Sequence, residues 1–311
     1  MNQVATILIM FAAFLWSTDA LLRLPLTEHL SSQVIVFYEH LFGVVLLLPV
    51  LLFSLRKYRN LSRRDWVAIL FIGIGGSALA TVLFTQSFNY VSPSVSILLQ
   101  KVQPIIVIIL AAAFLRERMG KFFWLWAGLA MVGAYVISFP RLVPDWSLSD
   151  SRGIYLALGA AGLWAASTVA GRMIATRLSF PALTAIRLLT ALVFLILLMN
   201  FNHSFGDIGS LQKTDVWSLI LITLFPGTGA LLLYYWGLRH IRASVATIAE
   251  LFFPFSAVVL NWIYLDERLS LAQIAGGVVL VISIFMVQRS SRHAYSVSTS
   301  ANDNSQKVLP V

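Results

Sequence analysis

The 311-residue sequence contains no cysteine and few charged residues. Without cysteine the chain has no disulfides, thiolate nucleophiles or iron–sulfur ligands. Its charged share of 11% is less than half of the roughly 25% that is typical of a soluble domain. The five histidines show no metal-ligand spacing with acids, and no nucleotide-binding motif occurs. The sequence therefore indicates no metal, no cofactor and no ATP-driven activity within the chain.

Long apolar runs take the place of the missing charge, because 59% of the residues are hydrophobic. A helix needs roughly 17–25 apolar residues to cross a bilayer, and runs this long lack the period-two alternation of a membrane barrel. The first run has no basic leader or cleavage site, so we interpret it as a span and not as a signal peptide. The sequence predicts an all-α membrane protein with the lipid bilayer as its solvent. The ten predicted spans are 4–22, 33–55, 66–88, 93–115, 122–139, 153–175, 180–200, 215–238, 243–264 and 271–288.

Lysine and arginine are concentrated in alternate loops. With a cytoplasmic N-terminus, fifteen lie in inner loops and the C-terminal tail, five lie in outer loops, and Lys101 and Arg187 lie inside the membrane. The net charge of +9 is thus a topology signal that predicts both termini inside, and not a sign of nucleic-acid binding. The five outer residues are Arg23, Arg141, Arg152, Lys213 and Arg268.

An internal repeat joins the two halves of the chain. QKVQPIIVIILAAAFLRERM (100–119) aligns with ELFFPFSAVVLNWIYLDERL (250–269) at an offset of 150 residues. Each half has five spans, so the second half enters the membrane inverted, and inverted repeats are an architecture of secondary transporters. We predict a first repeat at 4–139, a second at 153–288, and a disordered cytoplasmic tail at 289–311. The matched residues are Pro104 and Pro254, Glu117 and Glu267, and Arg118 and Arg268.

This organisation resembles the drug/metabolite transporter superfamily, and specifically its EamA branch. The likeness rests on ten spans, two halves of five, and a proline followed by Glu-Arg near the end of the fourth span of each half. It implies a ten-helix permease of the bacterial inner membrane, in a family with many exporters of amino acids, other metabolites or toxic compounds. The shared motif is mainly structural and transfers no substrate. Glu117 and Glu267 are interpreted as capping or loop-bonding residues.

Four ionisable residues lie at similar depth, about six to eight residues from one end of their spans. Glu39 and Lys101 lie in the first half, and Arg187 and Glu250 in the second, with the signs exchanged between corresponding helices. We expect two buried ion pairs, Glu39–Lys101 and Arg187–Glu250, because an unpaired charge at membrane depth is costly. They either line a translocation path or serve only as packing devices.

Two prolines favour the interpretation that these residues line a translocation path. Pro104 cannot bond the carbonyl of Gln100, and Pro254 cannot bond that of Glu250. A freed carbonyl beside a polar side chain is tolerated only in protein or a wet cavity. The prolines therefore predict helix kinks that present Gln100, Lys101 and Glu250 to a shared interior.

Weaker candidates for substrate contact complete the predicted site. Trp16 and Trp164 occupy matched positions and would wall the cavity from both halves, unless they only pack. His40 adjoins Glu39, while Gln86 and Tyr235 lie near span ends, where they gate the path or anchor at the headgroups.

The predicted function is secondary transport of a small molecule by alternating access. Charged cavity groups favour an amino acid-like or organic-acid compound, and export follows from the resemblance alone. Protons coupled through Glu250 and a homodimer are open possibilities. An organic-cation exporter would use Glu39 and Glu250, and a passive channel or receptor is a further alternative. An intramembrane lipid-modifying enzyme would need clustered His, Asp or Ser, and the sequence offers only His40 beside Glu39.

Overall fold

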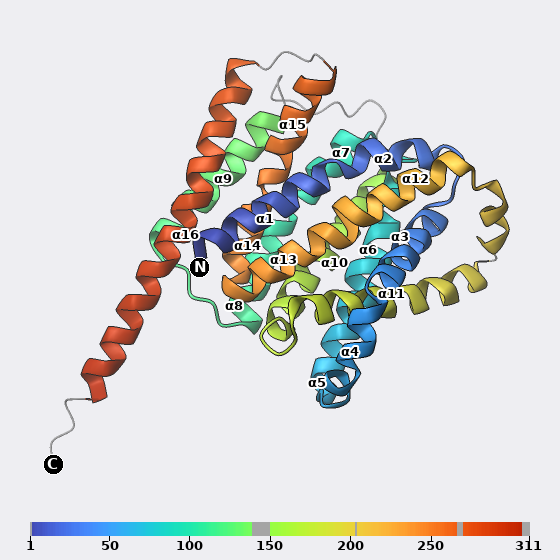
Figure 1. Ribbon diagram of the computed structural model, residues 1–311. Helices are drawn as coiled ribbons and strands as arrows, with labels where there is room; N and C mark the ends of the chain where they lie inside the picture. The colour runs from blue at the N-terminus through green and yellow to red at the C-terminus, as the bar shows by residue number, and fades with distance from the viewer. Residues whose placement is uncertain (1, 139–149, 203, 266–269, 307–311) are drawn as a thin grey trace.

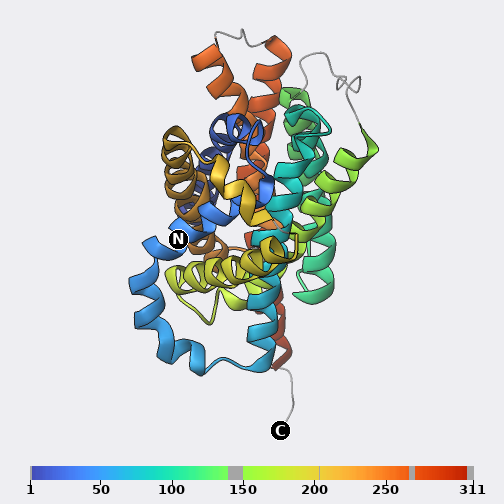
Figure 2. The same ribbon diagram turned by 90° about the vertical axis from the view of Figure 1, so that its right-hand side faces the viewer.

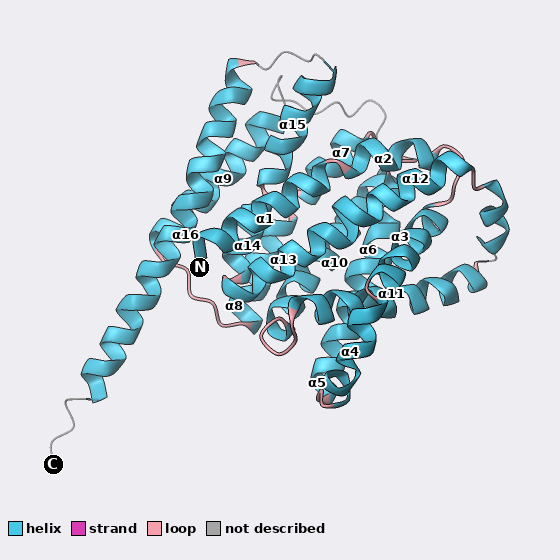
Figure 3. Cartoon of the chain, viewed as in Figure 1, coloured by secondary structure: helices cyan, strands magenta, loops and turns pink. Residues whose placement is uncertain are grey.

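The computed structural model describes residues 2–138, 150–202, 204–265 and 270–306, and the regular structure within these ranges is helical throughout (Figures 1 and 3). The predicted loop and motif positions Arg141, Glu267, Arg268 and Lys307 lie outside them. The first half contains α1 (Asn2–Ser17), α2 (Asp19–Thr27), α3 (Ser32–Leu46), α4 (Leu48–Arg59), α5 (Arg63–Leu70), η1 (Phe71–Leu79), α6 (Ala80–Ser87), α7 (Pro93–Gln100), α8 (Gln103–Phe114) and α9 (Lys121–Ser138). The second contains α10 (Ser151–Ile174), α11 (Phe180–Phe201), η2 (Ser204–Ser210), α12 (Lys213–Ile222), η3 (Thr223–Gly227), α13 (Thr228–His240), α14 (Ala243–Glu250), α15 (Phe252–Leu265) and α16 (Leu271–Gln306).

Nine helical stretches of the described chain are long and apolar enough to cross a membrane, and α3 with α4 makes a tenth that is bent by 77°. Pro49 lies in the first turn of α4 and explains the bend, since proline cannot donate to the preceding turn. Figure 2 shows α4 turning away from the bundle toward its lower end. The predicted ten-helix membrane fold is thereby confirmed.

The two halves carry matching irregularities. The fourth span is interrupted between α7 and α8, and the ninth between α14 and α15, each just before the proline of the repeat. At the first interruption the N–H groups of Lys101 and Val102 bond three residues back, to the carbonyls of Leu98 and Leu99. The third and eighth spans contain the π-helical segments η1 and η3. Such segments are often found at functional sites, and they lie at equivalent places in the two repeats.

The halves interlock and do not form separate bundles. Helix α1 packs against α13, and its counterpart α10 packs against η1 and α6. Helix α3 packs against α11, α8 against α14, and α9 against α16. The last three interfaces join equivalent spans of opposite halves. The first two, span 1 against span 8 and span 6 against span 3, correspond to each other in the two halves, as expected for two inverted five-helix repeats around one interior.

Small residues of η1 allow the closest of these approaches. A side-chain carbon at Gly73 would collide with Thr190 of α11, and one at Gly76 would collide with Ser167 of α10. Gly73 and Gly76 therefore serve helix packing. The same close approach brings α11 near the Gly76 carbonyl.

The C-terminal segment differs from the sequence prediction. Helix α16 continues to Gln306, whereas a disordered tail was expected from residue 289. After Gly277 the helix contains neither glycine nor proline, so no residue of its backbone forces it to end. In Figure 1 this last stretch extends beyond the other helices.

Candidate functional site

A cavity lies in the interior shared by the two halves. It measures about 180 Å³, counted as the space open to the centre of a water-sized sphere. One water needs about 10–15 Å³ on such a measure, so the cavity is large enough for a small organic molecule. Its polar lining residues are Asp19, Arg23, Glu39, His40, Ser77, Thr81, Gln100, Lys101, Gln103, Ser167, Thr168, Arg187, Thr247 and Glu250. Its aromatic lining residues are Trp16, Phe84, Phe88, Trp164, Tyr234 and Phe253.

The two interrupted helices meet at this cavity. Gln103, at the start of α8, donates a hydrogen bond from Nε2 to Glu250 Oε2 at the end of α14, at 2.9 Å. The Lys101 ammonium lies 4.5 Å from the centre of the Phe253 ring, a cation–π contact. It also interacts electrostatically with Glu250. Gln103 of the first repeat therefore bonds Glu250 of the second, and Phe253 of the second repeat contacts Lys101 of the first.

Several polar atoms of the cavity lining have no hydrogen-bond partner among the described residues. They are Ser167 Oγ, Thr247 Oγ1 and Glu250 Oε1. The Ser167 and Thr247 side chains are at least nine-tenths buried and line the cavity. Lys101 likewise forms no ion pair or hydrogen bond through its ammonium in the described structure. Because buried polar groups are normally satisfied, by protein groups, water or a bound molecule, these groups are the candidate contacts in this cavity.

The predicted Glu39–Lys101 pair is wrong. Glu39 Oε2 accepts a bond at 2.8 Å from Arg23, which also bonds Asp19 at 2.6 Å. Arg23 was assigned to an outer loop, but it lies in α2 and only 3% of its side chain is exposed. Helix α2 continues past the end of the predicted span, and this places Arg23 four residues after Asp19 on the same face.

The predicted Arg187–Glu250 pair is also absent. Arg187 donates to Ser77 Oγ, to the Tyr235 hydroxyl at 2.7 Å and to the Gly76 carbonyl at 3.1 Å. These acceptors are neutral, and no carboxylate pairs with Arg187 in the described part of the chain. The close approach of α11 to η1 gives the guanidinium nearer partners than Glu250.

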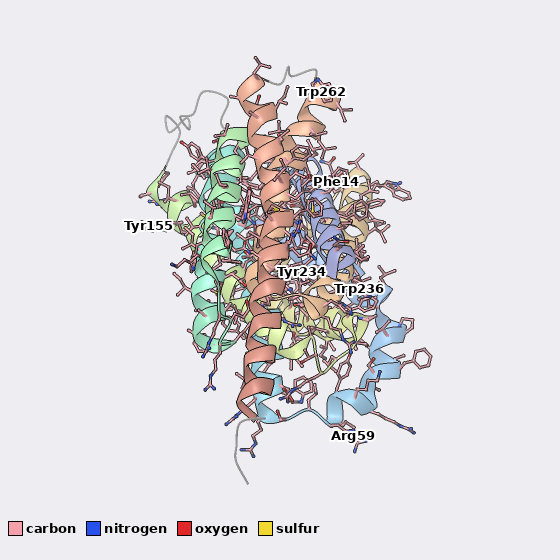
Figure 4. All side chains as sticks on the ribbon, turned by 90° about the vertical axis from the view of Figure 1, so that its left-hand side faces the viewer. Phe14, Arg59, Tyr155, Tyr234, Trp236 and Trp262 are labelled. Carbon is pink, nitrogen blue, oxygen red and sulfur yellow. The ribbon has the colours of Figure 1, made fainter. Side chains whose placement is uncertain are left out.

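Two aromatic pairs line the cavity, and they lie at positions that correspond between the two repeats. Trp16 of α1 lies 5.3 Å from Tyr234 of α13, and Trp164 of α10 lies 5.1 Å from Phe84 of α6. Each pair joins opposite halves. Figure 4 places Tyr234 inside the bundle, while the exposed Tyr155 stands at its periphery. Tyr234 also shares a 3.0 Å hydrogen bond with Thr168.

Most of the predicted site residues reach the cavity, and two do not. Tyr235 is 1% exposed and lies behind Arg187, where it holds the guanidinium without lining the cavity. Gln86 is also outside the lining, because Thr81, Phe84 and Phe88 form the cavity face of the third span at helical spacing and Gln86 lies off that face. The eight that line the cavity are Trp16, Glu39, His40, Gln100, Lys101, Trp164, Arg187 and Glu250.

Sequence reasoning missed several lining residues. Asp19 was not among the predicted site residues and Arg23 was assigned to an outer loop, although their spacing of four residues was a visible signal. Gln103 was not among the predicted site residues either. The hydroxyls Ser167 and Thr247 carry no pattern that separates them from ordinary helix-packing residues.

Glu117 has the structural role predicted for it. Its carboxylate accepts the backbone N–H groups of Ala243 and Ser244 at 2.9 and 3.1 Å, at the N-terminus of α14. A carboxylate there satisfies unpaired donors and complements the helix dipole. The repeat motif thus fixes the interrupted ninth span to the end of the fourth.

Comparison with known families decides the class of protein. The model of the EamA-like transporter family matches residues 3–139 and 151–289. This chain is an EamA-like transporter. It therefore belongs to the drug/metabolite transporter superfamily, and it is a multi-pass membrane transporter and not an enzyme.

Relatives of this EamA-like protein carry transporter names. The chain is 32% identical over 292 residues to the riboflavin transporter ImpX of Fusobacterium nucleatum, which covers 91% of this chain and 97% of that protein. It is 24% identical over 309 residues to the uncharacterized transporter YvbV of Bacillus subtilis, covering 96% of this chain and 95% of that one. A crystal structure with 17% sequence identity matches with a TM-score of 0.73 over 94% of this chain and 99% of its own, which shows a shared fold.

Proposed function

We propose that this EamA-like transporter is a secondary carrier for a flat, polar heterocyclic metabolite of the riboflavin class. The observation that carries the proposal is the pairing of aromatic walls with unpartnered polar groups in one cavity. The two cross-half pairs Trp16–Tyr234 and Trp164–Phe84 offer ring surfaces to a planar ligand. The relative named as a riboflavin transporter supports this substrate class.

Aromatic rings and polar groups suit different parts of such a molecule. A flat ring system gains contact area and offset stacking from tryptophan and tyrosine. A few well-placed polar groups then set its orientation. Thr247, Ser167 and Glu250 present atoms without partners at the same cavity, as a ligand with several hydrogen-bonding groups requires.

A second candidate substrate is an amino acid-like or organic-acid compound. The observation in its favour is that Lys101 and Arg187 line the cavity without a paired carboxylate among the described residues. An organic cation is less well matched, because the Glu39 carboxylate already bonds Arg23 at 2.8 Å.

The setting of the carrier follows from the charge pattern and the repeats. We propose an inner-membrane location with both termini cytoplasmic, supported by the excess of Lys and Arg at the α4–α5 end of the bundle. Repeats at 4–139 and 153–288 would rock around the cavity and expose it alternately to the two sides. Proton coupling at Glu250, export and a homodimer stay predictions.

Counterflow in proteoliposomes tests the transport proposal. Vesicles with purified protein and an internal load of unlabelled riboflavin should accumulate labelled riboflavin transiently, in a saturable manner, and protein-free vesicles should not. Competition by excess amino acids, organic acids or a lipophilic cation separates the candidate substrates. Absence of riboflavin counterflow together with strong competition-sensitive flux of another class would reject the riboflavin-class substrate.

Matched tryptophan variants locate the effect in the cavity. Trp164→Leu should lower counterflow at least ten-fold, because an aromatic wall is lost. Trp124→Leu alters a tryptophan of α9 that is 55% exposed on the outer surface of the bundle and should leave counterflow within two-fold of the unmodified protein. Equal losses in both variants would argue for a general effect on folding.

A further inference from the structure

The meeting point of the two interrupted helices has a donor and an acceptor that form no hydrogen bond or ion pair of normal geometry among the described residues. Lys101, at the break of the fourth span, has an ammonium that contacts the Phe253 ring and interacts electrostatically with Glu250, without a hydrogen bond or ion pair among the described residues. Glu250, at the break of the ninth span, uses Oε2 for Gln103, and Oε1 makes no hydrogen bond that meets normal geometry among the described residues. The Tyr234 hydroxyl also interacts with this carboxylate. Thr247 lies one turn earlier on α14, is fully buried and has an unpartnered hydroxyl. All three line the cavity.

The local charge balance favours a neutral ligand group at this point. One ammonium and one carboxylate interact electrostatically across the break, so together they carry no net charge. A lone anion would satisfy Lys101 and be repelled by Glu250, while a lone cation would do the reverse. A group that offers acceptors beside a donor satisfies Lys101, Thr247 and Glu250 together.

The imide edge of a flavin is such a group. Its pyrimidine ring presents C(=O)–NH–C(=O), two carbonyl acceptors that flank one N–H donor. We propose that Glu250 accepts the imide N–H and that Lys101 and Thr247 donate to the flanking carbonyls. This subsite rests on the proposed riboflavin-class function and specifies which edge of the substrate the helix breaks recognise.

Gln103 has a positioning role in this arrangement. Its Nε2 holds Glu250 Oε2 at 2.9 Å and thereby leaves Oε1 as the acceptor that is open to the ligand. Gln103 is only 7% exposed, so its amide is fixed by packing. The two repeats therefore build the subsite together, one supplying the ammonium and the other the carboxylate.

Binding of riboflavin and N3-methylriboflavin by the purified protein tests the subsite. Quenching of flavin fluorescence by the cavity tryptophans reports binding. Methylation removes the imide donor and leaves Glu250 unpaired, so N3-methylriboflavin should bind at least ten-fold more weakly than riboflavin. The control ligand is 5-deazariboflavin, which keeps the imide edge and should bind within two-fold of riboflavin.

Two carboxylate variants assign the effect to Glu250. Glu250→Met keeps the side-chain length but has no hydrogen-bonding carboxylate, so it should weaken riboflavin binding and reduce the riboflavin to N3-methylriboflavin affinity ratio to within two-fold of one. Glu39→Gln changes another carboxylate of the cavity and should preserve the ratio, whatever its effect on each affinity. A ratio that is retained in Glu250→Met would remove Glu250 from the subsite.

The comparison of the two ligands on the unmodified protein needs no variant to fold. Equal affinity for riboflavin and N3-methylriboflavin would overturn the imide subsite and leave the riboflavin-class function standing. Absence of binding by riboflavin, 5-deazariboflavin and N3-methylriboflavin alike would overturn both.

Discussion

Gln103 and Glu250 join the two repeats through one hydrogen bond of 2.9 Å at the point where both helices are interrupted. Gln103 directly precedes Pro104, Glu250 lies four residues before Pro254, and each bonds across to the other half. The bond therefore couples two spans at the points where their regular helix geometry is interrupted. Motion of one half against the other must either carry this bond along or break it.

Removal of this bond should cost stability without loss of the fold. Gln103→Leu keeps a similar volume but leaves Glu250 Oε2 without its buried donor, and an unsatisfied buried polar group costs about 1–3 kcal/mol. The unfolding midpoint in mixed micelles should fall accordingly. Gln86→Leu, which alters a glutamine outside the cavity lining, should shift the midpoint much less. A fall of the same size in both variants would contradict a special role for the Gln103–Glu250 bond.

The charge cluster on α2 and α3 should be the most sensitive ionic feature of the protein. Arg23→Met leaves Asp19 and Glu39 without their shared cation, and loss of one partner of a buried pair costs about 3–5 kcal/mol. The purified yield and the unfolding midpoint should both fall sharply. Arg152→Met, at the exposed start of α10, provides the matched control.

Neutralisation of the stranded acids checks this explanation. Addition of Asp19→Asn and Glu39→Gln to Arg23→Met should restore much of the lost stability, since no uncompensated charge remains. A triple variant that is no more stable than Arg23→Met would show that the lost packing of arginine, and not its charge, dominates.

The comparison of sequence and structure shows where patterns are informative. Span positions follow from hydrophobic run length, and the prolines at 104 and 254 locate the two interruptions because a missing N–H has a fixed local effect. The partners of the buried charged residues, in contrast, could not be predicted from sequence patterns. Lys101 and Glu39 share a half and a depth, but the rotation of each helix decides which faces meet, and one sequence does not reveal that rotation.

Arg23 and Arg187 illustrate the missing information. Helix α2 extends past residue 22, where the predicted span ended. The length of the apolar run therefore placed Arg23 in a loop. Arg187 finds Ser77 and Tyr235 because glycine allows η1 and α11 to approach closely. Such close approach depends on tertiary packing, and hydrophobic periodicity carries no record of it.

The capping role of Glu117 gives a prediction at the end of the bundle. Glu117→Ala removes the acceptor of two N–H groups at the start of α14, and loss of an N-terminal cap costs about 0.5–2 kcal/mol. The unfolding midpoint should fall, and Glu117→Gln should retain part of the difference because an amide oxygen still accepts. Glu28→Ala, which alters an exposed acid at the C-terminal end of α2, should have little effect. Equal stability of Glu117→Ala and Glu28→Ala would refute the capping role.

Opposite orientation of the two repeats predicts opposite accessibility for two equivalent loops. The natural chain has no cysteine, so single substitutions Gly120→Cys and Ser270→Cys provide clean labelling sites just before α9 and α16. With an impermeant maleimide on intact cells, Ser270→Cys should react from outside and Gly120→Cys only after the membrane is opened. The exposed control Arg152→Cys, at the start of α10, should behave as Ser270→Cys does. Reaction of positions 120 and 270 from the same side would contradict the inverted repeat, and alternating access around the cavity would lose its structural basis.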